Sequence, residues 1–263
     1  MTIRWLSLAV VLSISFPGIA ADKLPETGKQ FPALASFDEL MREFVRENEI
    51  PGAALAVAKD GRLVYARGFG YANRKRKEPV RPNSLFRIAS ISKPLTAVAT
   101  LQLIEQGKLK IDDRVFKLLP HRAHLPQGGK VDPRLNQITL AHLMRHQGGW
   151  DRGKSIDPMF HSIEIATALG KRPPANPDDI IRFMKGWPLD FDPGTRYAYS
   201  NLGYCLLGRV IEQTTGCGYE AYLKNSVLKP LGITRMRTGK TLPAQRATGE
   251  VTYYPRGELV GLA

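Results

Sequence analysis

The sequence predicts an α+β protein with a β-hairpin near its N-terminus and a largely helical middle. Two short apolar segments, residues 53–58 and 63–71, are separated by Asp60-Gly61, which is a strong signal for a hairpin. Between residues 111 and 185, short helical patterns alternate with polar, proline-rich loops. A chain of 263 residues, 43% of them hydrophobic, is long enough to bury a core in one domain or two lobes.

The first elements follow from local signals. Residues 22–35 have the composition of a loose segment, whereas apolar residues recur at helical spacing over 37–49. A second helix is expected after Pro82-Asn83-Ser84 and ends at Gly107. Its apolar side would be formed by Leu95, Val98, Ala99, Leu101, Leu103 and Ile104.

Three shorter helices are expected further along the chain. Residues 139–145 form a helical pattern that a threonine can cap. Residues 202–214 and 219–227 form two more, and Pro230-Leu231-Gly232 follows them. The sequence has no internal repeat and no low-complexity segment.

The most informative polar pattern is Ser90-Ile91-Ser92-Lys93, at the start of the second helix. Residues three apart lie on one face of a helix, so the Ser90 hydroxyl and the Lys93 amine can meet. A serine hydroxyl is a poor nucleophile until a neighbouring base takes its proton, and a desolvated lysine can be that base. Ser90 is therefore a candidate nucleophile, although serine and lysine occur at this spacing on many helices.

Tyr199-Ser200-Asn201 is the second informative pattern. A phenol beside an ammonium can have a lowered pKa and transfer a proton. An asparagine amide can orient a substrate carbonyl or the lysine. We therefore expect Tyr199 to share acid–base work with Lys93 and Asn201 to bind substrate, and the sequence does not decide whether Lys93 or Tyr199 is the base.

These two patterns, in this order, resemble the motifs of the serine beta-lactamase-related family. That family includes class C beta-lactamases, D-alanyl-D-alanine carboxypeptidases and related esterases. Phe86-Arg87-Ile88-Ala89-Ser90 is similar to the lead into its Ser-x-x-Lys motif, and residues 191–201 are similar to its Pro-Gly approach to Tyr-x-Asn. The resemblance extends from about Phe37 to the C-terminus.

The resemblance implies an antiparallel sheet flanked by helices, beside a mostly helical lobe. It implies a serine hydrolase that acts through an acyl-enzyme on an amide, ester or lactam bond, and the N-terminal pattern described below adds that the hydrolase is exported. The catalytic residues would be Ser90, Lys93 and Tyr199, and Asn201 would contact the substrate. No cofactor or metal is implied.

The resemblance also implies a third motif, Lys-Thr-Gly or His-x-Gly, on a late strand of the sheet. His146-Gln147-Gly148 has suitable letters but precedes Tyr199, and Arg237-Thr238-Gly239 has no apolar strand pattern before it. We therefore expect the chain to end before this motif, leaving an incomplete sheet with an open edge. A non-catalytic envelope protein that binds peptidoglycan peptides or beta-lactams is the alternative hypothesis, and a poorly folding truncated product is the third.

Patterns for metal and phosphate sites are incomplete. His142 and His146 are four apart, but Leu143 stands where the metalloprotease motif requires glutamate. We interpret His146 as a structural loop residue. Gly239-Lys240-Thr241 lacks the first glycine of a phosphate-binding loop, because position 234 is threonine.

The N-terminus has the pattern of a secretory signal peptide. Arg4 precedes an apolar run over residues 6–16, and the small residues at 18–21 offer a cleavage site. The apolar run is too short to span a membrane. We expect a signal peptide over residues 1–21, a beta-lactamase-related domain over 22–263, and a periplasmic or secreted location.

The formal net charge is +14, and its densest run, residues 74–77, falls in a predicted hairpin loop. No nucleic-acid-binding motif accompanies the basic residues, so we expect no nucleic-acid partner. Attraction to anionic envelope polymers or lipid headgroups fits the charge. The expected partner is a small-molecule or peptide substrate, and the sequence does not indicate the oligomeric state.

Cys205 and Cys217 are too few for a disulfide framework. We expect two buried free thiols. A disulfide between them is the alternative in an oxidising compartment.

Overall fold

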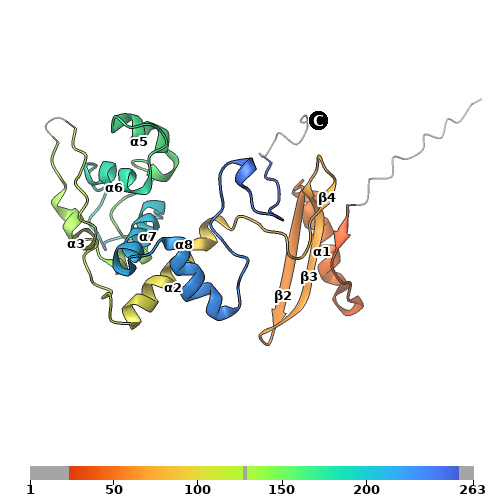
Figure 1. Ribbon diagram of the computed structural model, residues 1–263. Helices are drawn as coiled ribbons and strands as arrows, with labels where there is room; N and C mark the ends of the chain where they lie inside the picture. Colours follow the sequence, from red (N-terminus) through yellow and green to blue (C-terminus); the bar gives the residue numbers. More distant parts are fainter. Residues whose placement is uncertain (1–23, 127–128, 255–263) are drawn as a thin grey trace, which may run out of the picture. The chain divides into compact units, whose positions relative to one another are not determined.

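The computed structural model describes residues 24–126 and 129–254, which fall into two compact units (Figure 1). Of the described residues, unit 1 consists of those up to Phe86 and from Leu242 onward, and unit 2 of those from Arg87 to Thr241. Each unit has a hydrophobic core of its own. The expected signal peptide lies outside the described residues.

Unit 1 is an antiparallel sheet with a helix packed on one face. The sheet consists of β1 (Glu26–Thr27), β2 (Gly52–Lys59), β3 (Arg62–Asn73) and β4 (Glu78–Pro79), and the helix is α1 (Ala35–Glu47). The strand order is β1-β3-β2, and β4 pairs with the end of β3. This open antiparallel sheet with a flanking helix confirms the predicted fold class in unit 1.

The predicted hairpin forms between β2 and β3. Lys59 pairs with Arg62 across the two-residue turn, in which Asp60 and Gly61 have φ values of 51° and 70°. A two-residue hairpin turn needs positive φ at both positions, which Asp-Gly supplies at low cost. Alternate side chains of the two strands then meet α1 in a small core formed by Met41, Val45, Tyr65 and Phe69.

A buried ion cluster also ties α1 to the sheet. Arg67 on β3 is 1% exposed, and its guanidinium lies 2.6 Å from Asp38 of α1 and 3.2 Å from Glu26 of β1. Tyr65 donates a hydrogen bond of 2.5 Å to Asp38, and Arg42 pairs with Glu26 at 2.6 Å. A buried guanidinium needs such partners because desolvating an unpaired charge is very costly.

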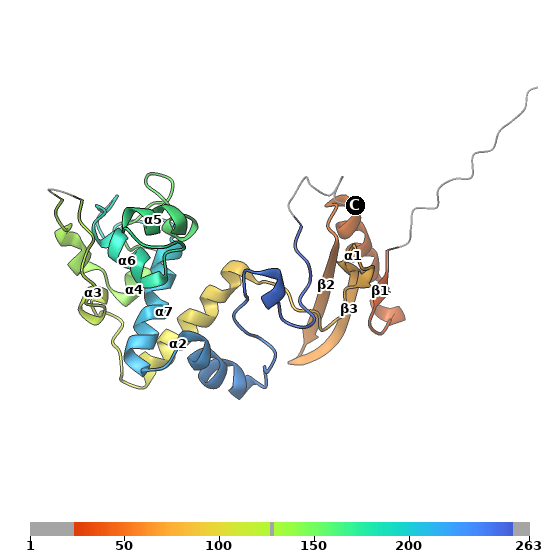
Figure 2. The same cartoon turned by 45° about the horizontal axis from the view of Figure 1, so that its top comes forward.

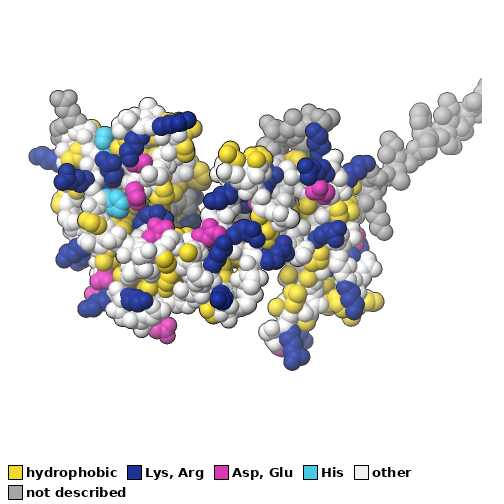
Figure 3. Space-filling model, viewed as in Figure 1, with side chains coloured by type: hydrophobic (Ala, Val, Ile, Leu, Met, Phe, Trp, Pro, Cys, Tyr) yellow, Lys and Arg dark blue, Asp and Glu magenta, His cyan; other side chains and the backbone are white. Residues whose placement is uncertain are grey.

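The partners of β3 decide two sequence predictions for unit 1, one on the segment before α1 and one on the basic run at residues 74–77. The described part of the segment expected to be loose, residues 24–35, is partly regular, because β1 pairs with β3 and Pro32–Leu34 forms a 3₁₀ turn. The basic run at residues 74–77 is the exposed turn between β3 and β4, as predicted. Lysine and arginine side chains are scattered over the visible surface rather than gathered in one stripe (Figure 3).

Unit 2 is helical, which confirms the predicted mostly helical lobe. Its helices are α2 (Ser92–Glu105), α3 (Val115–Leu118), α4 (Leu140–Met144), α5 (Ser162–Ala168), α6 (Pro177–Lys185), α7 (Asn201–Thr215) and α8 (Tyr219–Tyr222). The core is built around α7, which contacts α2, α4 and α6 (Figure 2). Its buried side chains include Leu202, Leu206, Leu207, Val210 and Ile211.

Some details of unit 2 differ from the sequence predictions. On α2, Ala99 and Leu103 are buried, but Val98 and Leu101 are 44% and 47% exposed, so the buried stripe is narrower than predicted. The helix expected over 219–227 begins as α8 and continues as a π-helical turn, Leu223–Leu228.

The cysteines are both free thiols. Cys217 is exposed, which corrects the expectation that both would be buried, because it follows the C-terminal glycine of α7 in an open turn. Burial raises the pKa of the Cys205 thiol to about 11. None of the described helices has the length and apolarity needed to cross a membrane.

Candidate active site

Ser90 and Lys93 lie at the entrance to α2. Ser90 is in a 3₁₀ turn, Ala89–Ile91, and Lys93 is the second residue of the α-helix that follows. Ser90 thus precedes the α-helix by one turn, but the predicted contact forms: Lys93 Nζ donates to Ser90 Oγ at 3.1 Å. Ala89 has a φ of 44°, a left-handed conformation that costs a non-glycine residue about 1–3 kcal/mol.

Tyr199 and Asn201 are positioned by the start of α7. The Ser200 side chain caps that helix by accepting the Gly203 N–H at 3.1 Å. Tyr199 therefore sits just before the helix, and Asn201 occupies its first position.

Lys93 joins the two segments. Its ammonium donates to Tyr199 Oη at 2.6 Å and to Asn201 Oδ1 at 2.7 Å. Tyr199 Oη in turn lies 2.5 Å from Ser90 Oγ. The structure thus brings together all four side chains that the sequence singled out, and their catalytic roles stay predictions.

The arrangement suits Tyr199 for proton transfer. The hydrogen bond from Lys93, followed by that with Ser90, lowers the pKa of the Tyr199 phenol. Lys93 Nζ also lies 4.6 Å from the centroid of the Tyr199 ring. Because Lys93 has three N–H groups and three oxygen acceptors, it is fully engaged as a donor.

His146 packs against the ring of Tyr199. Its ring stacks on the Tyr199 ring with 4.6 Å between centroids, and its Nδ1 accepts the Ser200 backbone N–H at 3.1 Å. Burial, with the nearby charge of Lys93, lowers the pKa of the His146 imidazole. His146 is therefore a neutral ring with its proton on Nε2, and it packs as a loop residue.

The loop before Tyr199 runs along the turn that contains His146. Gly194 N–H donates to the Gln147 carbonyl at 2.9 Å, and Ala198 N–H to the His146 carbonyl at 2.8 Å. Gly194 has a φ of 84°, and a Cβ there would lie 2.8 Å from His142 Nε2. The Pro-Gly step before Tyr199 is thus required by backbone conformation and by space.

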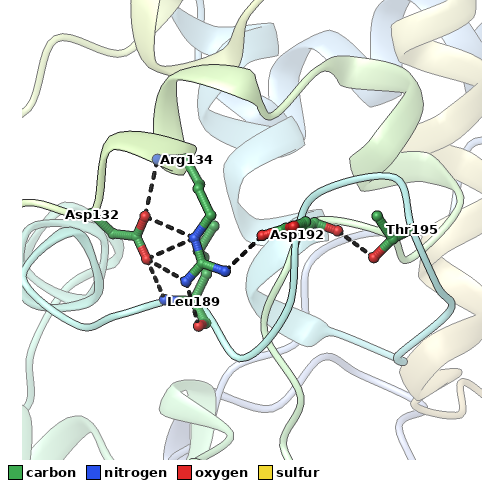
Figure 4. Close-up of polar contacts among 5 residues, drawn as sticks. All are labelled: Asp132, Arg134, Leu189, Asp192 and Thr195. Carbon is green, nitrogen blue, oxygen red and sulfur yellow. Dashed lines mark hydrogen bonds and ion pairs between the residues drawn. The ribbon is translucent and has the colours of Figure 1, made fainter.

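A polar cluster anchors the beginning of the same loop (Figure 4). Arg134 donates to Asp132 at 2.7 Å, to Asp192 at 2.8 Å and to the Leu189 carbonyl at 2.8 Å. The Leu189 N–H donates to Asp132 at 3.0 Å, and the Thr195 hydroxyl donates to the Asp192 carbonyl at 2.7 Å. The Arg134 guanidinium is the largest cause that lowers the pKa of Asp132 to about 2.

Two residues that no sequence pattern indicated also contact the site. Asp157 accepts a hydrogen bond of 2.7 Å from Asn201 Nδ2. Arg152 lies 3.6 Å from the Asp157 carboxylate, and its guanidinium carbon lies 4.8 Å from the centroid of the Tyr199 ring. No local motif could have identified them, because both contacts join positions far apart in the sequence.

The other sequence patterns considered above do not form sites in the described part of the chain. Arg237-Thr238-Gly239 lies in a segment without strand structure, so it does not supply the strand-borne third motif. Among the described residues, no group of three or more histidine, cysteine, aspartate and glutamate side chains is placed to hold a metal ion.

Comparisons with known proteins identify the family of the chain. The family model for Beta-lactamase matches residues 37–261. Esterase EstB of Burkholderia gladioli is 32% identical over 202 residues, which is 76% of this chain and 50% of the esterase.

Two solved structures are also similar. The octameric penicillin-binding protein homologue from Pyrococcus abyssi has a TM-score of 0.63 and 33% identity, over 77% of this chain and 44% of that chain. EstCE1, described as a hydrolase with promiscuous acyltransferase activity, has a TM-score of 0.60 and 30% identity, over 74% and 50%. The chain therefore spans about half the length of the relatives it matches, and it belongs to the beta-lactamase family.

Proposed function

We propose that this chain is a serine hydrolase that forms an acyl-enzyme on Ser90. The observation that carries the proposal is the triangle of Ser90, Lys93 and Tyr199, in which Tyr199 Oη lies 2.5 Å from Ser90 Oγ and 2.6 Å from Lys93 Nζ. A serine is activated when its hydroxyl contacts an acid–base group directly and a cation holds that group in place.

Tyr199 is the proposed base. Lys93 as an ammonium already donates to three oxygens and has no lone pair to accept a proton. The Tyr199 phenolate takes the Ser90 proton while Oγ attacks the carbonyl carbon of the substrate. The tetrahedral intermediate collapses as the bond to the leaving group breaks, and the phenol of Tyr199 returns the proton to the leaving group.

Hydrolysis of the acyl-enzyme repeats these transfers with water. Tyr199 takes a proton from water, the hydroxide oxygen attacks the acyl carbon, and the ester bond to Ser90 breaks. Ser90 Oγ then recovers the proton from Tyr199. Throughout, Lys93 stabilises negative charge on the Tyr199 oxygen, and Asn201 orients Lys93.

The substrate class we propose is a small ester, amide or lactam. The name of esterase EstB and the description of EstCE1 as a hydrolase with acyltransferase activity support acyl chemistry. The beta-lactamase family model supports lactams as candidate substrates. All of these react by attack of an oxygen nucleophile on a carbonyl carbon.

Intact mass spectrometry tests the proposal. The purified chain is incubated with a fluorophosphonate and, separately, with a fluorescent penicillin, and Ser90→Ala is treated in the same way. A one-to-one adduct that is absent from Ser90→Ala is the expected result. Ser92→Ala is a matched control, because Ser92 is a nearby hydroxyl outside the triangle.

The two probes separate the substrate classes. Labelling by both favours lactams and related peptides, whereas labelling by fluorophosphonate alone favours esters. If the chain unfolds cooperatively yet takes up neither probe, the hydrolase proposal is wrong, and a non-catalytic envelope protein that binds such ligands becomes the better hypothesis.

We further propose that the protein is exported. Arg4, the apolar run at residues 6–16 and the small residues at 18–21 support this. Expression of the full chain followed by N-terminal sequencing of the recovered protein tests it. Cleavage after Ala20 or Ala21 is expected, and recovery of an uncleaved chain from the cytoplasm would contradict it.

A further inference from the structure

The amide of Asn201 is held from both sides. Its Oδ1 accepts from Lys93 at 2.7 Å, and its Nδ2 donates to Asp157 at 2.7 Å. Rotating the amide by half a turn would place its NH₂ group against the Lys93 ammonium and its oxygen against the Asp157 carboxylate. Both new contacts would be repulsive, so the two charged neighbours select one orientation.

Asp157 is suited to hold the Asn201 amide because its side chain is nearly buried. Its side chain is 12% exposed, and it accepts the Met159 N–H at 3.3 Å at the start of a 3₁₀ turn. Its cationic neighbour, Arg152, is 51% exposed and lies 3.6 Å away. The closest polar partner of the Asp157 carboxylate is therefore the amide of Asn201.

We infer that Asp157 is a positioning residue that fixes the Asn201 amide and, through it, the Lys93 ammonium between Ser90 and Tyr199. This inference rests on the proposed hydrolase function. Asp157 touches none of the reacting atoms itself. Without it, the Lys93 ammonium alone holds the Asn201 amide, so the amide can shift and take the ammonium out of its position between the two hydroxyls.

The test compares two substitutions at one position. Asp157→Ala removes the acceptor, whereas Asp157→Asn keeps an oxygen that can accept from Asn201 Nδ2. We expect Asp157→Ala to slow Ser90 labelling by the fluorophosphonate about tenfold to a hundredfold, as small displacements of catalytic groups do. Asp157→Asn should restore most of the labelling rate. When an ester substrate is hydrolysed with turnover, Asp157→Ala should lower kcat while KM changes little.

Two controls isolate the route through Asn201. Asp178→Ala removes a carboxylate that is 56% exposed and contacts His121 instead, and it should leave labelling unchanged. Arg152→Ala removes the cation that neighbours Asp157 and also its contact with the Tyr199 ring. Asp157→Ala should therefore still slow labelling in an Arg152→Ala background, and if it causes no further loss there, the effect passes through Arg152 and the inference is overturned.

The side-chain amide signal of Asn201 in a ¹⁵N-correlated spectrum provides a readout that does not need activity. In the unmodified chain, the proton donated to Asp157 should resonate downfield of its partner, and this separation should shrink in Asp157→Ala and persist in Asp157→Asn. If the unmodified chain is never labelled but the signal moves as described, the hydrolase function is wrong and the positioning contact stands. If folded Asp157→Ala keeps both the signal and the labelling rate, the inference is overturned.

Discussion

The Nδ1 atom of His146 accepts a hydrogen bond from the backbone N–H of Ser200, while the imidazole ring stacks on the Tyr199 side chain next to it. One residue thus holds the backbone at the start of α7 and the ring of the proposed base. His146 achieves this from a left-handed conformation with a φ of 58°.

His146→Ala should therefore slow Ser90 labelling about tenfold or more, because Tyr199 loses both its stacking partner and a fixed backbone. His146→Asn should retain more of the rate, since asparagine tolerates positive φ and its Oδ1 can accept the Ser200 N–H. Labelling time courses measure both rates. Equal rates in the two variants would show that this acceptor is not important.

Tyr199→Phe should lower the rate of Ser90 labelling by about 10²–10⁴-fold, because it removes the acid–base oxygen and keeps the ring. Packing against His146 remains, so the thermal unfolding temperature should change little. Tyr197→Phe is the matched control, since Tyr197 is 62% exposed and also lies against His146. A labelling rate for Tyr199→Phe equal to that of Tyr197→Phe would rule out Tyr199 as the base.

Lys93→Ala should shift the pH dependence of labelling upward. The hydrogen bond from Lys93 is the largest cause of the lowered pKa of Tyr199, so its loss lets that pKa rise toward the ordinary phenol value of 10.0. The phenolate fraction at neutral pH then falls, and rate recovers only at higher pH. Labelling rates between about pH 6 and 11 measure the shift, and an unchanged midpoint would contradict the role of Lys93.

The Asp132–Arg134 pair should make the free energy of unfolding depend on pH in the acidic range. Asp132 has a pKa of about 2 in the folded chain against an ordinary 3.8, so its ionised form favours folding. This contribution is complete above pH 4 and is lost as the pH falls toward 2. Arg134→Ala should flatten that dependence.

At neutral pH, Arg134→Ala should lower the free energy of unfolding, because the enclosed Asp132 carboxylate loses its charged donor. Denaturant titrations at several pH values measure both effects. Asp192→Asn is the control, since Asp192 is 65% exposed and should contribute less than about 1 kcal/mol. A pH dependence in Arg134→Ala equal to that of the unmodified chain would exclude this pair as its source.

In unit 1, Asp38→Ala should cost about 3–5 kcal/mol, because it leaves the buried Arg67 guanidinium without its closest carboxylate. Tyr65→Phe removes one hydrogen bond to the same carboxylate and should cost about 1.5–3 kcal/mol. Denaturant unfolding followed by circular dichroism gives both values. The hypothesis fails if Asp38→Ala is no more destabilising than Tyr65→Phe.

Local patterns in the sequence were sufficient for the elements that local physics determines. The Asp60-Gly61 turn, the threonine cap of α4 and the contact of Ser90 with Lys93 each depend on residues within a few positions of one another. The proximity of Tyr199 and Asn201 to Lys93 was predicted from two motifs taken together, and the structure brings them together.

Features that depend on distant contacts could not be predicted in this way. Strand β1 has two residues, too few to show an alternating pattern, and it exists because β3 offers it an edge. The exposure of Val98 depends on which helices pack beside α2, which periodicity does not specify. Asp157 and Arg152 lie in a segment without a motif, and only the tertiary fold brings them to Asn201 and Tyr199.

The contact between Ser90 and Tyr199 closes a span of 109 residues within unit 2. Closing a loop of that length costs chain entropy that local helix formation does not repay, so such a contact forms late in refolding. The time at which Ser90 becomes reactive toward a fluorophosphonate would then report when the tertiary contacts of unit 2 form. When samples are taken at successive times during refolding, labelling of Ser90 should rise later than the helical circular dichroism signal. The delay would measure how long the helices exist before unit 2 is complete.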